Sequence, residues 1–316
     1  MTISVIILTA GTSDRLTYID ALLKSIAKQT VKPDEVIIAT ETSGAKLRQL
    51  LSEHLGGGPH RVIETGYWHK GKTANKAIAE AKGDIIFLLE DDLVLRRNFV
   101  EEVVKTFDEH KDAGCVYTNC IWVHQEGLKK RGGLAGLAAR LLSKLTVHEA
   151  LFPRQVKYLG DGLYEVPVFT MSVACKKEVL VRAGLYDEAL EEPIQGEDFD
   201  LALRIRASGF KIIMNPRAVS YHFTRQATKR AIKLARDPSH LEGIYRSEIY
   251  YLTKNINMVG PYLIPHIIYR TIEATTWALR TRKPKVLIYG VKGVIEGVMY
   301  GTEARRTNIW HWRKSH

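Results

Sequence analysis

Cysteine is scarce in this chain: only Cys115, Cys120 and Cys175 occur among its 316 residues. No two of them have the short spacing of a zinc-binding pair, which argues against a cysteine-based metal site. An odd and sparse count is typical of a reducing compartment and argues against a disulfide framework. We therefore expect a cytoplasmic protein whose cysteines are small buried residues without a catalytic role.

Long apolar runs are also missing. A membrane-spanning helix needs about 18–20 consecutive apolar residues, whereas the longest uncharged stretch, residues 255–269, is shorter and contains Pro261 and Pro265. The apolar segment Ser4–Leu8 is short and lacks a basic leader, so it is predicted to be a strand and not a signal peptide. There is no internal repeat and no low-complexity tract. These absences predict a folded chain that does not span a membrane.

Acidic residues are scarce only in the last part of the chain. Residues 1–223 contain 29 Lys+Arg and 29 Asp+Glu, whereas residues 224–316 contain 17 and six, so the whole excess of +11 lies there. Such asymmetry predicts an acidic partner: anionic lipid, nucleic acid or a phosphorylated acceptor. Basic, apolar and aromatic helical patterns favour an anionic membrane surface, and no recognisable module favours nucleic acid. Packing of these helices on the rest of the chain, or in a homo-oligomer, is the structural alternative.

The first 110 residues alternate between short apolar runs and helical patterns. The predicted strands are 5–8, 35–39, 61–64 and 85–89, and the predicted helices are 18–28, 47–54 and 72–82. Farther along the chain, a strand at 211–214, a separate stretch at 218–222 and helices at 265–279 and 286–299 are predicted. Runs that are apolar on both faces and joined by helices indicate a mostly parallel sheet flanked by helices. Ligands bind at the carboxyl ends of such strands, which is where Thr9, Glu41 and the cluster Glu90-Asp91-Asp92 fall.

Two acidic clusters point to the chemistry. Glu90-Asp91-Asp92 follows an apolar run, and neighbouring carboxylates repel each other unless they share a cation; a divalent metal that holds a phosphate is the common solution. Glu197-Asp198 begins a helical pattern after Gly196, and a separate carboxylate suits a general base. Metal and base together predict group transfer from a phosphorylated donor. The structural alternatives are a solvated acidic turn and acidic residues that only complement a helix dipole.

The motifs around both clusters resemble family 2 glycosyltransferases. Residues 83–92 (GDIIFLLEDD) resemble the strand and DxD element of that family, and residues 71–78 resemble its ARNxG element, with Asn75 at the asparagine. The most specific resemblance is to its GxFDE, GEDxDLxxR and GY block, in residues 184–188 (GLYDE), 196–204 (GEDFDLALR) and 209–210 (GF).

The resemblance covers roughly residues 3–223 and implies the domain organisation. Residues 1–223 would form a GT-A, Rossmann-like α/β domain with an acceptor-side insertion at 124–165. Residues 224–316 would form a basic, aromatic-rich helical extension at a membrane surface.

The resemblance also implies roles for individual residues. Asp92 would bind Mg²⁺ or Mn²⁺ on the donor diphosphate, with His222 nearby, and Asp198 would be the general base. Glu197 would orient the base or touch the acceptor. Donor contacts are expected from Thr9, Glu41, Asn75, Glu90 and Asp91, and a basic pocket for the leaving diphosphate from Arg225 or Lys229. Glutamate stands at positions 41 and 90, where the family usually has aspartate.

The implied activity is inverting transfer of a sugar from a nucleotide-diphosphate sugar to an acceptor hydroxyl. The acceptor would be a glycan or lipid-linked glycan at the cytosolic face of the membrane. One alternative is a sugar-phosphate nucleotidyltransferase, because Leu8–Arg15 slightly resembles its glycine-rich loop, although Gly11 is the only glycine there. The other is a catalytically silent protein that binds sugar nucleotide or membrane on the same fold.

Overall fold

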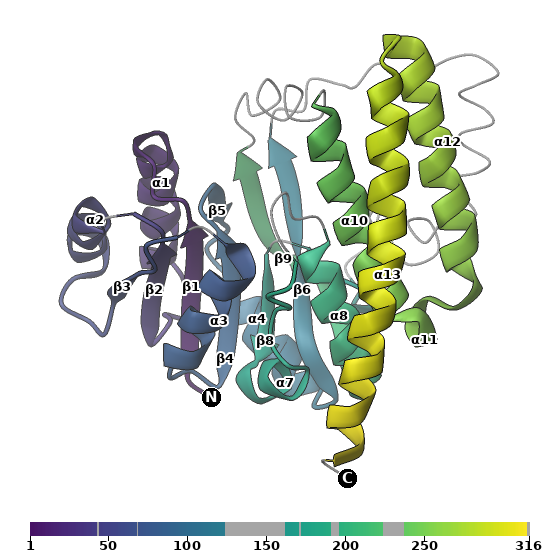
Figure 1. Cartoon of the computed structure of the whole chain (residues 1–316). Coiled ribbons are helices and arrows are strands. Elements are labelled where there is room, and N and C mark those ends of the chain that lie inside the picture. The colour runs from purple at the N-terminus through teal and green to yellow at the C-terminus, as the bar shows by residue number, and fades with distance from the viewer. Residues whose placement is uncertain are drawn as a thin grey trace. The chain divides into compact units, whose positions relative to one another are not determined.

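The computed structural model describes residues 1–42, 44–67, 69–123, 162–170, 172–190, 196–223 and 237–314 (Figure 1). The chain divides into two compact units: residues 1–126, 158–188 and 204–224 form the first, and residues 127–157, 189–203 and 225–316 form the second. Most of the predicted insertion (residues 124–161), together with Arg225 and Lys229, lies outside the described residues.

A mixed β-sheet organises the first unit. Its order is β3-β2-β1-β4-β8-β6-β9-β5, with β7 paired to β9. Neighbours among β1–β4 are parallel, as are β6 and β9, whereas β8 is antiparallel to β4 and β6. The strands are β1 (Ile3–Thr9), β2 (Glu35–Thr40), β3 (Arg61–Glu64), β4 (Ile85–Glu90), β5 (Leu93–Leu95), β6 (Ala113–Val123), β7 (Tyr164–Glu165), β8 (Val173–Lys176) and β9 (Lys211–Phe223). The four strands predicted in the first 110 residues are confirmed.

Helices pack their apolar stripes on this sheet. Ile19, Leu22 and Leu23 of α1 are fully buried against strand residues that are themselves fully buried, such as Val5 and Phe87. Burial on both faces explains why these strands contain almost no polar residue before their carboxyl ends. The helical segments are η1 (Ser13–Arg15), α1 (Leu16–Ala27), α2 (Ala45–Leu55), α3 (Lys70–Glu80), α4 (Phe99–Glu109) and α7 (Lys177–Arg182).

Strand β9 is continuous over 13 residues, although the sequence predicted a strand at 211–214 and a separate stretch at 218–222. Its pairing with β6 shifts register between Asn215 and Val219, so the residues around Pro216 bulge from the ladder. Proline has no backbone N–H to give to a ladder and is tolerated at such a bulge. Beyond the bulge β9 continues to His222, which pairs with Leu93 of β5.

The prediction that no disulfide forms is wrong. Cys115 on β6 and Cys175 on β8 are paired across the two antiparallel strands, with 4.0 Å between their Cα atoms, and their Sγ atoms are bonded. The two residues are 60 positions apart, so only the strand pairing brings them together. Cys120 is the free cysteine.

The second unit is helical. It contains the first residues of α8 (Glu197–Ala207), then α10 (Pro238–Lys254), α11 (Ile256–Val259), η2 (Gly260–Tyr262), α12 (Leu263–Thr281) and α13 (Pro284–Lys314). In Figure 1 the long helix α13 lies along α10, and α12 joins it through a tight turn. The helices predicted at 265–279 and 286–299 are confirmed and are longer than expected. Within the described residues, no helix combines the length and apolarity required to cross a bilayer.

Glycines on one side of α13 allow its close approach to α10. A Cβ added at Gly293, Gly297 or Gly301 would collide with backbone atoms of α10. These residues recur at a spacing of four, which places them on one helical face. The helix therefore packs backbone against backbone along this side.

Candidate active site

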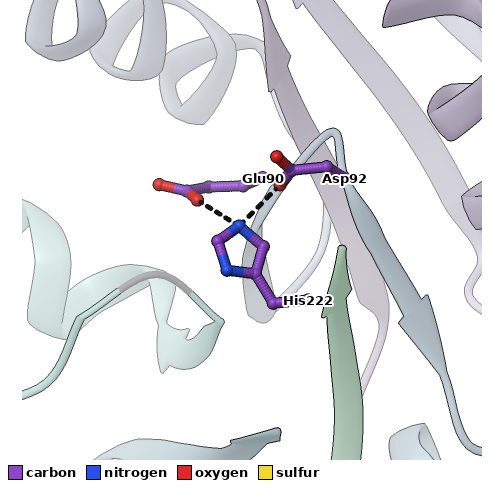
Figure 2. Close-up of side chains that lie close together, drawn as sticks. All are labelled: Glu90, Asp92 and His222. Carbon is purple, nitrogen blue, oxygen red and sulfur yellow. Dashed lines mark ion pairs between the residues drawn. The ribbon is translucent and has the colours of Figure 1, made fainter. Parts of the chain in front are cut away.

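The acidic cluster lies in the turn between β4 and β5. Glu90 is the last residue of β4, and Asp91 and Asp92 form the turn before β5. The backbone N–H of Phe223 donates to the carbonyl oxygen of Asp92 at 2.9 Å, which fixes the end of β9 beside this turn. The neighbouring His222 consequently projects toward the two acidic side chains, as Figure 2 shows.

Three side chains converge at this point. His222 Nε2 lies 2.8 Å from Asp92 Oδ1 and 3.5 Å from Glu90 Oε2. One potential ligand atom from each residue lies within 4.8 Å of the others. Asp92 and His222 are buried and Glu90 is half-buried. Two carboxylates and an imidazole are a ligand set suited to Mn²⁺ or another divalent metal.

Hydrogen bonding leaves part of this cluster unsatisfied. Asp92 Oδ1 and His222 Nδ1 are buried and have no hydrogen-bond partner among the residues that the structure describes. The 2.8 Å approach of Asp92 Oδ1 to His222 Nε2 therefore lacks hydrogen-bond geometry. Asp92 Oδ1, which is buried and faces His222 Nε2, fits a cation shared between these two atoms, because a buried polar atom without a partner is costly.

Arg15 neutralises the other side of the cluster. Its guanidinium donates to Asp91 Oδ1 at 3.0 Å and to Asp92 Oδ2 at 2.9 Å. Asp91 Oδ2 accepts a 2.5 Å hydrogen bond from the hydroxyl of Thr9, at the end of β1. Asp91 and Thr9 are thus brought to the predicted edge but are engaged with each other. Sequence reasoning missed Arg15, because an arginine in a polar loop gives no sign of its partners.

The pKa values reflect burial and these partners. Burial raises the pKa of Asp91 to about 6, and the Thr9 hydrogen bond and the Arg15 charge oppose only part of this effect. Burial also acts to raise the pKa of Asp92, but His222 and Arg15 outweigh it, so this pKa is lowered. Burial acts to lower the pKa of His222, but the nearby Asp92 and Glu90 outweigh it, so this pKa is raised.

Two residues of β6 line the imidazole and the cluster. The ring of Trp122 meets His222 edge-on, with 4.3 Å between ring centroids. Burial raises the pKa of the Cys120 thiol to about 11, so the thiolate form is negligible at neutral pH.

Glu41 and Asn75, both predicted to contact the donor, lie in different surroundings. Glu41 directly follows β2 and is half-buried at the carboxyl edge of the sheet. Asn75 of α3 is engaged elsewhere: its amide nitrogen donates to the Tyr186 carbonyl and to Glu188, and its amide oxygen accepts from the Tyr186 N–H. Asn75 therefore stabilises the turn at 186–188, because both its amide nitrogen and its amide oxygen form hydrogen bonds there.

The second acidic cluster begins α8, in the other compact unit. Gly196 precedes it with φ +96°, a conformation that L side chains rarely adopt, and an added Cβ would collide with the ring of Tyr251. Asp198 is buried and Glu197 is half-buried in the first turn. Asp200 is fully buried and bonds Lys254 Nζ at 2.7 Å and Asn255 Nδ2 at 2.8 Å, both at the end of α10.

Comparison with known proteins finds similarity to glycosyltransferases. The sequence model described as Glycosyl transferase family 2 matches residues 4–157. The O-antigen chain rhamnosyltransferase WbaN of Salmonella anatum is 25% identical over 264 residues, which are 77% of this chain and 78% of that protein.

Two solved structures share the fold at low identity. The crystal structure of GalNAc-T7 with UDP, GalNAc and Mn²⁺ has a TM-score of 0.56 at 17% identity, and the match covers 90% of this chain but only 58% of that one. The mannosyltransferase PcManGT from Pyrobaculum calidifontis, in complex with GDP-Man and Mn²⁺, has a TM-score of 0.52 at 19% identity over 94% of this chain and 86% of its own. The predicted GT-A fold is confirmed. The chain is therefore a glycosyltransferase whose residues 4–157 match glycosyl transferase family 2.

Proposed function

We propose that this glycosyltransferase moves a sugar from a nucleotide-diphosphate sugar to an acceptor hydroxyl with inversion at the anomeric carbon. The observation that carries the proposal is the convergence of Glu90, Asp92 and His222 at the carboxyl edge of the parallel strands. Support comes from the GT-A neighbours, whose structures contain UDP or GDP-Man together with Mn²⁺.

The cluster is the proposed site of a divalent cation, Mg²⁺ or Mn²⁺. Asp92 Oδ1, His222 Nε2 and the Glu90 carboxylate would hold it, and Arg15 would keep the second oxygen of Asp92 engaged. When bound, such a cation offsets the negative charge that develops on the leaving diphosphate. Glu41 is half-buried at the same edge and remains a proposed contact to the nucleotide, whereas Glu90, expected from the sequence to contact the donor, is proposed here as a ligand of the cation.

Asp198 is the proposed general base. An alcohol has a pKa far above neutral, so a carboxylate must accept its proton as the oxygen attacks the anomeric carbon. The proton passes to Asp198 while the bond to the diphosphate oxygen breaks on the opposite face of the sugar, which inverts the configuration. Glu197, beside it in the first turn of α8, is proposed to orient the base or to contact the acceptor.

The proposed acceptor is a growing glycan or lipid-linked glycan. Support comes from the relative named as an O-antigen chain rhamnosyltransferase. A glycan acceptor presents hydroxyl groups of the kind that a single buried carboxylate can deprotonate.

A thermal-shift screen tests the donor class and the metal. One nucleoside diphosphate should raise the melting temperature only when Mn²⁺ is present, and Asp92→Ala should abolish that shift. A shift that survives in Asp92→Ala would reject the proposed cation site. Release of pyrophosphate from a nucleoside triphosphate and a sugar phosphate would instead support a nucleotidyltransferase.

Turnover of Asp198→Asn tests the base. The amide keeps the shape of the side chain but accepts no proton, so release of nucleoside diphosphate from the donor should fall about 10²- to 10⁴-fold while donor affinity stays unchanged. Equal turnover in both proteins would remove Asp198 from the mechanism. Donor binding without turnover in the wild-type protein would support the catalytically silent alternative.

A further inference from the structure

The helical hairpin α12–α13 exposes a stripe of large apolar side chains. On α12 this stripe consists of Ile264, Ile268, Ile272 and Leu279, whose exposed fractions are 68%, 49%, 42% and 75%. Their spacing places them on one face of the helix. Another face of α12 packs Ala274 and Ala278 into the core of the second unit, so the exposed stripe is not needed to hold the hairpin together.

The turn that follows this stripe is strongly basic. Arg280, Arg282, Lys283 and Lys285 lie within six positions and are all exposed. Within the described part of the chain none of the four has an acidic partner. The turn is ordered by its own backbone, because the N–H of Lys283 donates to the carbonyl of Ala278 at 3.1 Å. Four uncompensated positive charges are thus fixed directly beside Leu279.

Helix α13 also combines exposed apolar side chains with a basic residue. Ile288, Ile295 and Met299 are 63%, 54% and 61% exposed, and their spacing again defines one face. Lys292 lies on this face as well, and the surface is hollowed there by a shallow pocket of about 560 Å³. The pocket is lined by Leu287, Ile288, Val291, Lys292, Ile295 and Glu296.

We propose that the α12–α13 hairpin docks on the surface of an anionic lipid bilayer, with the basic turn against the headgroups and the apolar stripes at the acyl boundary. Charge complementarity selects this partner, because the whole excess of +11 lies in residues 224–316. An amphipathic helix with a basic edge lies in the plane of such a surface without crossing it.

A second copy of this chain fits the same face less well. Self-association would cover the apolar stripes, but a two-fold contact through the turn would bring Arg280, Arg282 and their neighbours against identical positive charges. An anionic bilayer would cover the apolar stripes and compensate the positive charges of the turn. A dimer would cover only the stripes. The inference does not depend on the identity of the donor or the base.

Vesicle co-sedimentation of the full chain tests the proposal. The protein should sediment with vesicles of phosphatidylcholine and phosphatidylglycerol, should be released by high salt, and should bind phosphatidylcholine alone much more weakly. Replacing Arg280, Arg282, Lys283 and Lys285 together by glutamine should weaken binding about 100-fold or more, since each basic residue near an anionic surface contributes about fivefold. These side chains are exposed and unpaired, so the variant should fold normally.

Two further variants sharpen the test. A matched control replaces four exposed lysines of the first unit, Lys28, Lys46, Lys82 and Lys111, by glutamine, which removes the same charge and should leave vesicle binding nearly unchanged. The pair Ile268→Ser and Leu279→Ser should weaken binding to the anionic vesicles at low salt, although it leaves the charge of the protein unchanged. Equal loss in the control, or no binding of the wild-type protein, would overturn the proposal.

Sedimentation velocity distinguishes membrane binding from binding of a second copy of the chain to the apolar stripes. A concentration-dependent dimer that Ile268→Ser abolishes, without vesicle binding, would assign the stripe to a second copy. The nucleotide and Mn²⁺ thermal shift is measured on the same variants, so loss of the membrane contact is distinguished from loss of the donor site.

Discussion

At the scale of single residues, the two carboxylate oxygens of Asp92 contact different partners, Arg15 and His222. Oδ2 accepts from Arg15 at 2.9 Å, whereas Oδ1 lies 2.8 Å from His222 Nε2. Because Arg15 also donates to Asp91 at 3.0 Å, one guanidinium offsets the repulsion between adjacent carboxylates. Arg15 therefore holds Asp92 with its free oxygen directed at the imidazole.

Replacement of Arg15 by glutamine should make the fold more dependent on a divalent cation. Loss of the two charged hydrogen bonds should lower the free energy of unfolding by about 1–3 kcal/mol in the absence of metal. Mn²⁺ should then stabilise the variant more than the wild-type protein, because a cation bound only to the folded state takes over the neutralising role. Thermal unfolding with and without Mn²⁺ measures both effects.

The control for this prediction is Arg48→Gln, which removes an exposed ion pair with Glu64. It should leave the response to Mn²⁺ unchanged. An identical Mn²⁺ response in Arg15→Gln and the wild-type protein would show that Arg15 does not share the charge of the cluster with a cation.

The carboxyl ends of the predicted strands and the family resemblance together predicted that Glu90, Asp92 and His222 lie near one another. The structure brings these three side chains together. The same reasoning could not predict Arg15, because its role depends on a guanidinium that crosses from the loop after β1 to the turn after β4. It also could not predict the direction of Asn75, whose amide bonds the turn at 186–188, more than a hundred positions away.

At the scale of elements, the start of β2 is fixed by a buried carboxylate. Glu35 accepts hydrogen bonds from the Ser4 hydroxyl, the Lys82 N–H and the Arg61 guanidinium. Burial acts to raise the pKa of Glu35, but these hydrogen bonds outweigh it, so the pKa lies below its ordinary value. A carboxyl group with a lower pKa in the folded chain stabilises the fold above its unfolded pKa, and this stabilisation is lost as the pH falls through its folded pKa.

Glu35→Gln should therefore lower the free energy of unfolding at pH 7 by about 1–2 kcal/mol. The difference from the wild-type protein should begin to shrink below the unfolded carboxyl pKa of about 4.5 and should be largely lost once the pH has fallen through the lower folded pKa. Urea unfolding at several pH values measures the difference, with the exposed Glu53→Gln as the control. A difference that stays constant with pH would contradict the lowered pKa.

The glycine face of α13 gives a second prediction at this scale. Glycine to alanine usually stabilises a helix by about 1 kcal/mol, but an added Cβ at Gly293 would meet the backbone carbonyl of Glu242. We expect Gly293→Ala to destabilise the protein by about 1–3 kcal/mol. Chemical unfolding measures the sign, with Gly57→Ala, which has open space around it, as the control. A stabilised Gly293→Ala protein would show that α10 and α13 do not pack so closely.

Helical and strand periodicity predicted most elements because the period of apolar residues is a local property. The continuous course of β9 was missed because Pro216 reads as a strand breaker, and only its pairing with β6 shows that it lies in a bulge. The Cys115–Cys175 disulfide was missed for a related reason: β6 and β8 pair across 60 positions, and no local pattern reports that register.

At the scale of the whole molecule, the helical tail does not separate cleanly from the Gly-Glu-Asp motif at the start of α8. Residues 189–203 group with the tail and not with the sheet, although the sequence placed a boundary at 223. Asp200 is fully buried, and Lys254 and Asn255 of the tail are its bonding partners. The tail therefore supports the turn that carries Asp198.

Lys254→Met should strongly destabilise this arrangement. The ion pair between Lys254 and Asp200 is almost fully buried, and removal of one partner leaves a buried charge, which costs about 3–5 kcal/mol. Lys292→Met, which removes an exposed ammonium group from its pair with Glu242, should have a smaller effect on unfolding. Similar unfolding transitions for the two variants would contradict a structural link between α8 and α10.

Electron paramagnetic resonance of Mn²⁺ tests the central claim most directly. Titration of the full chain with Mn²⁺, alone and with each nucleoside diphosphate, should reveal one saturable site per chain that is strengthened by one of the nucleotides. The account predicts that Asp92→Asn and His222→Gln lose this site, while Glu53→Gln keeps it. Unchanged Mn²⁺ binding in Asp92→Asn, or no binding in the wild-type protein with any nucleotide, would contradict the assignment of Glu90, Asp92 and His222 as the metal centre.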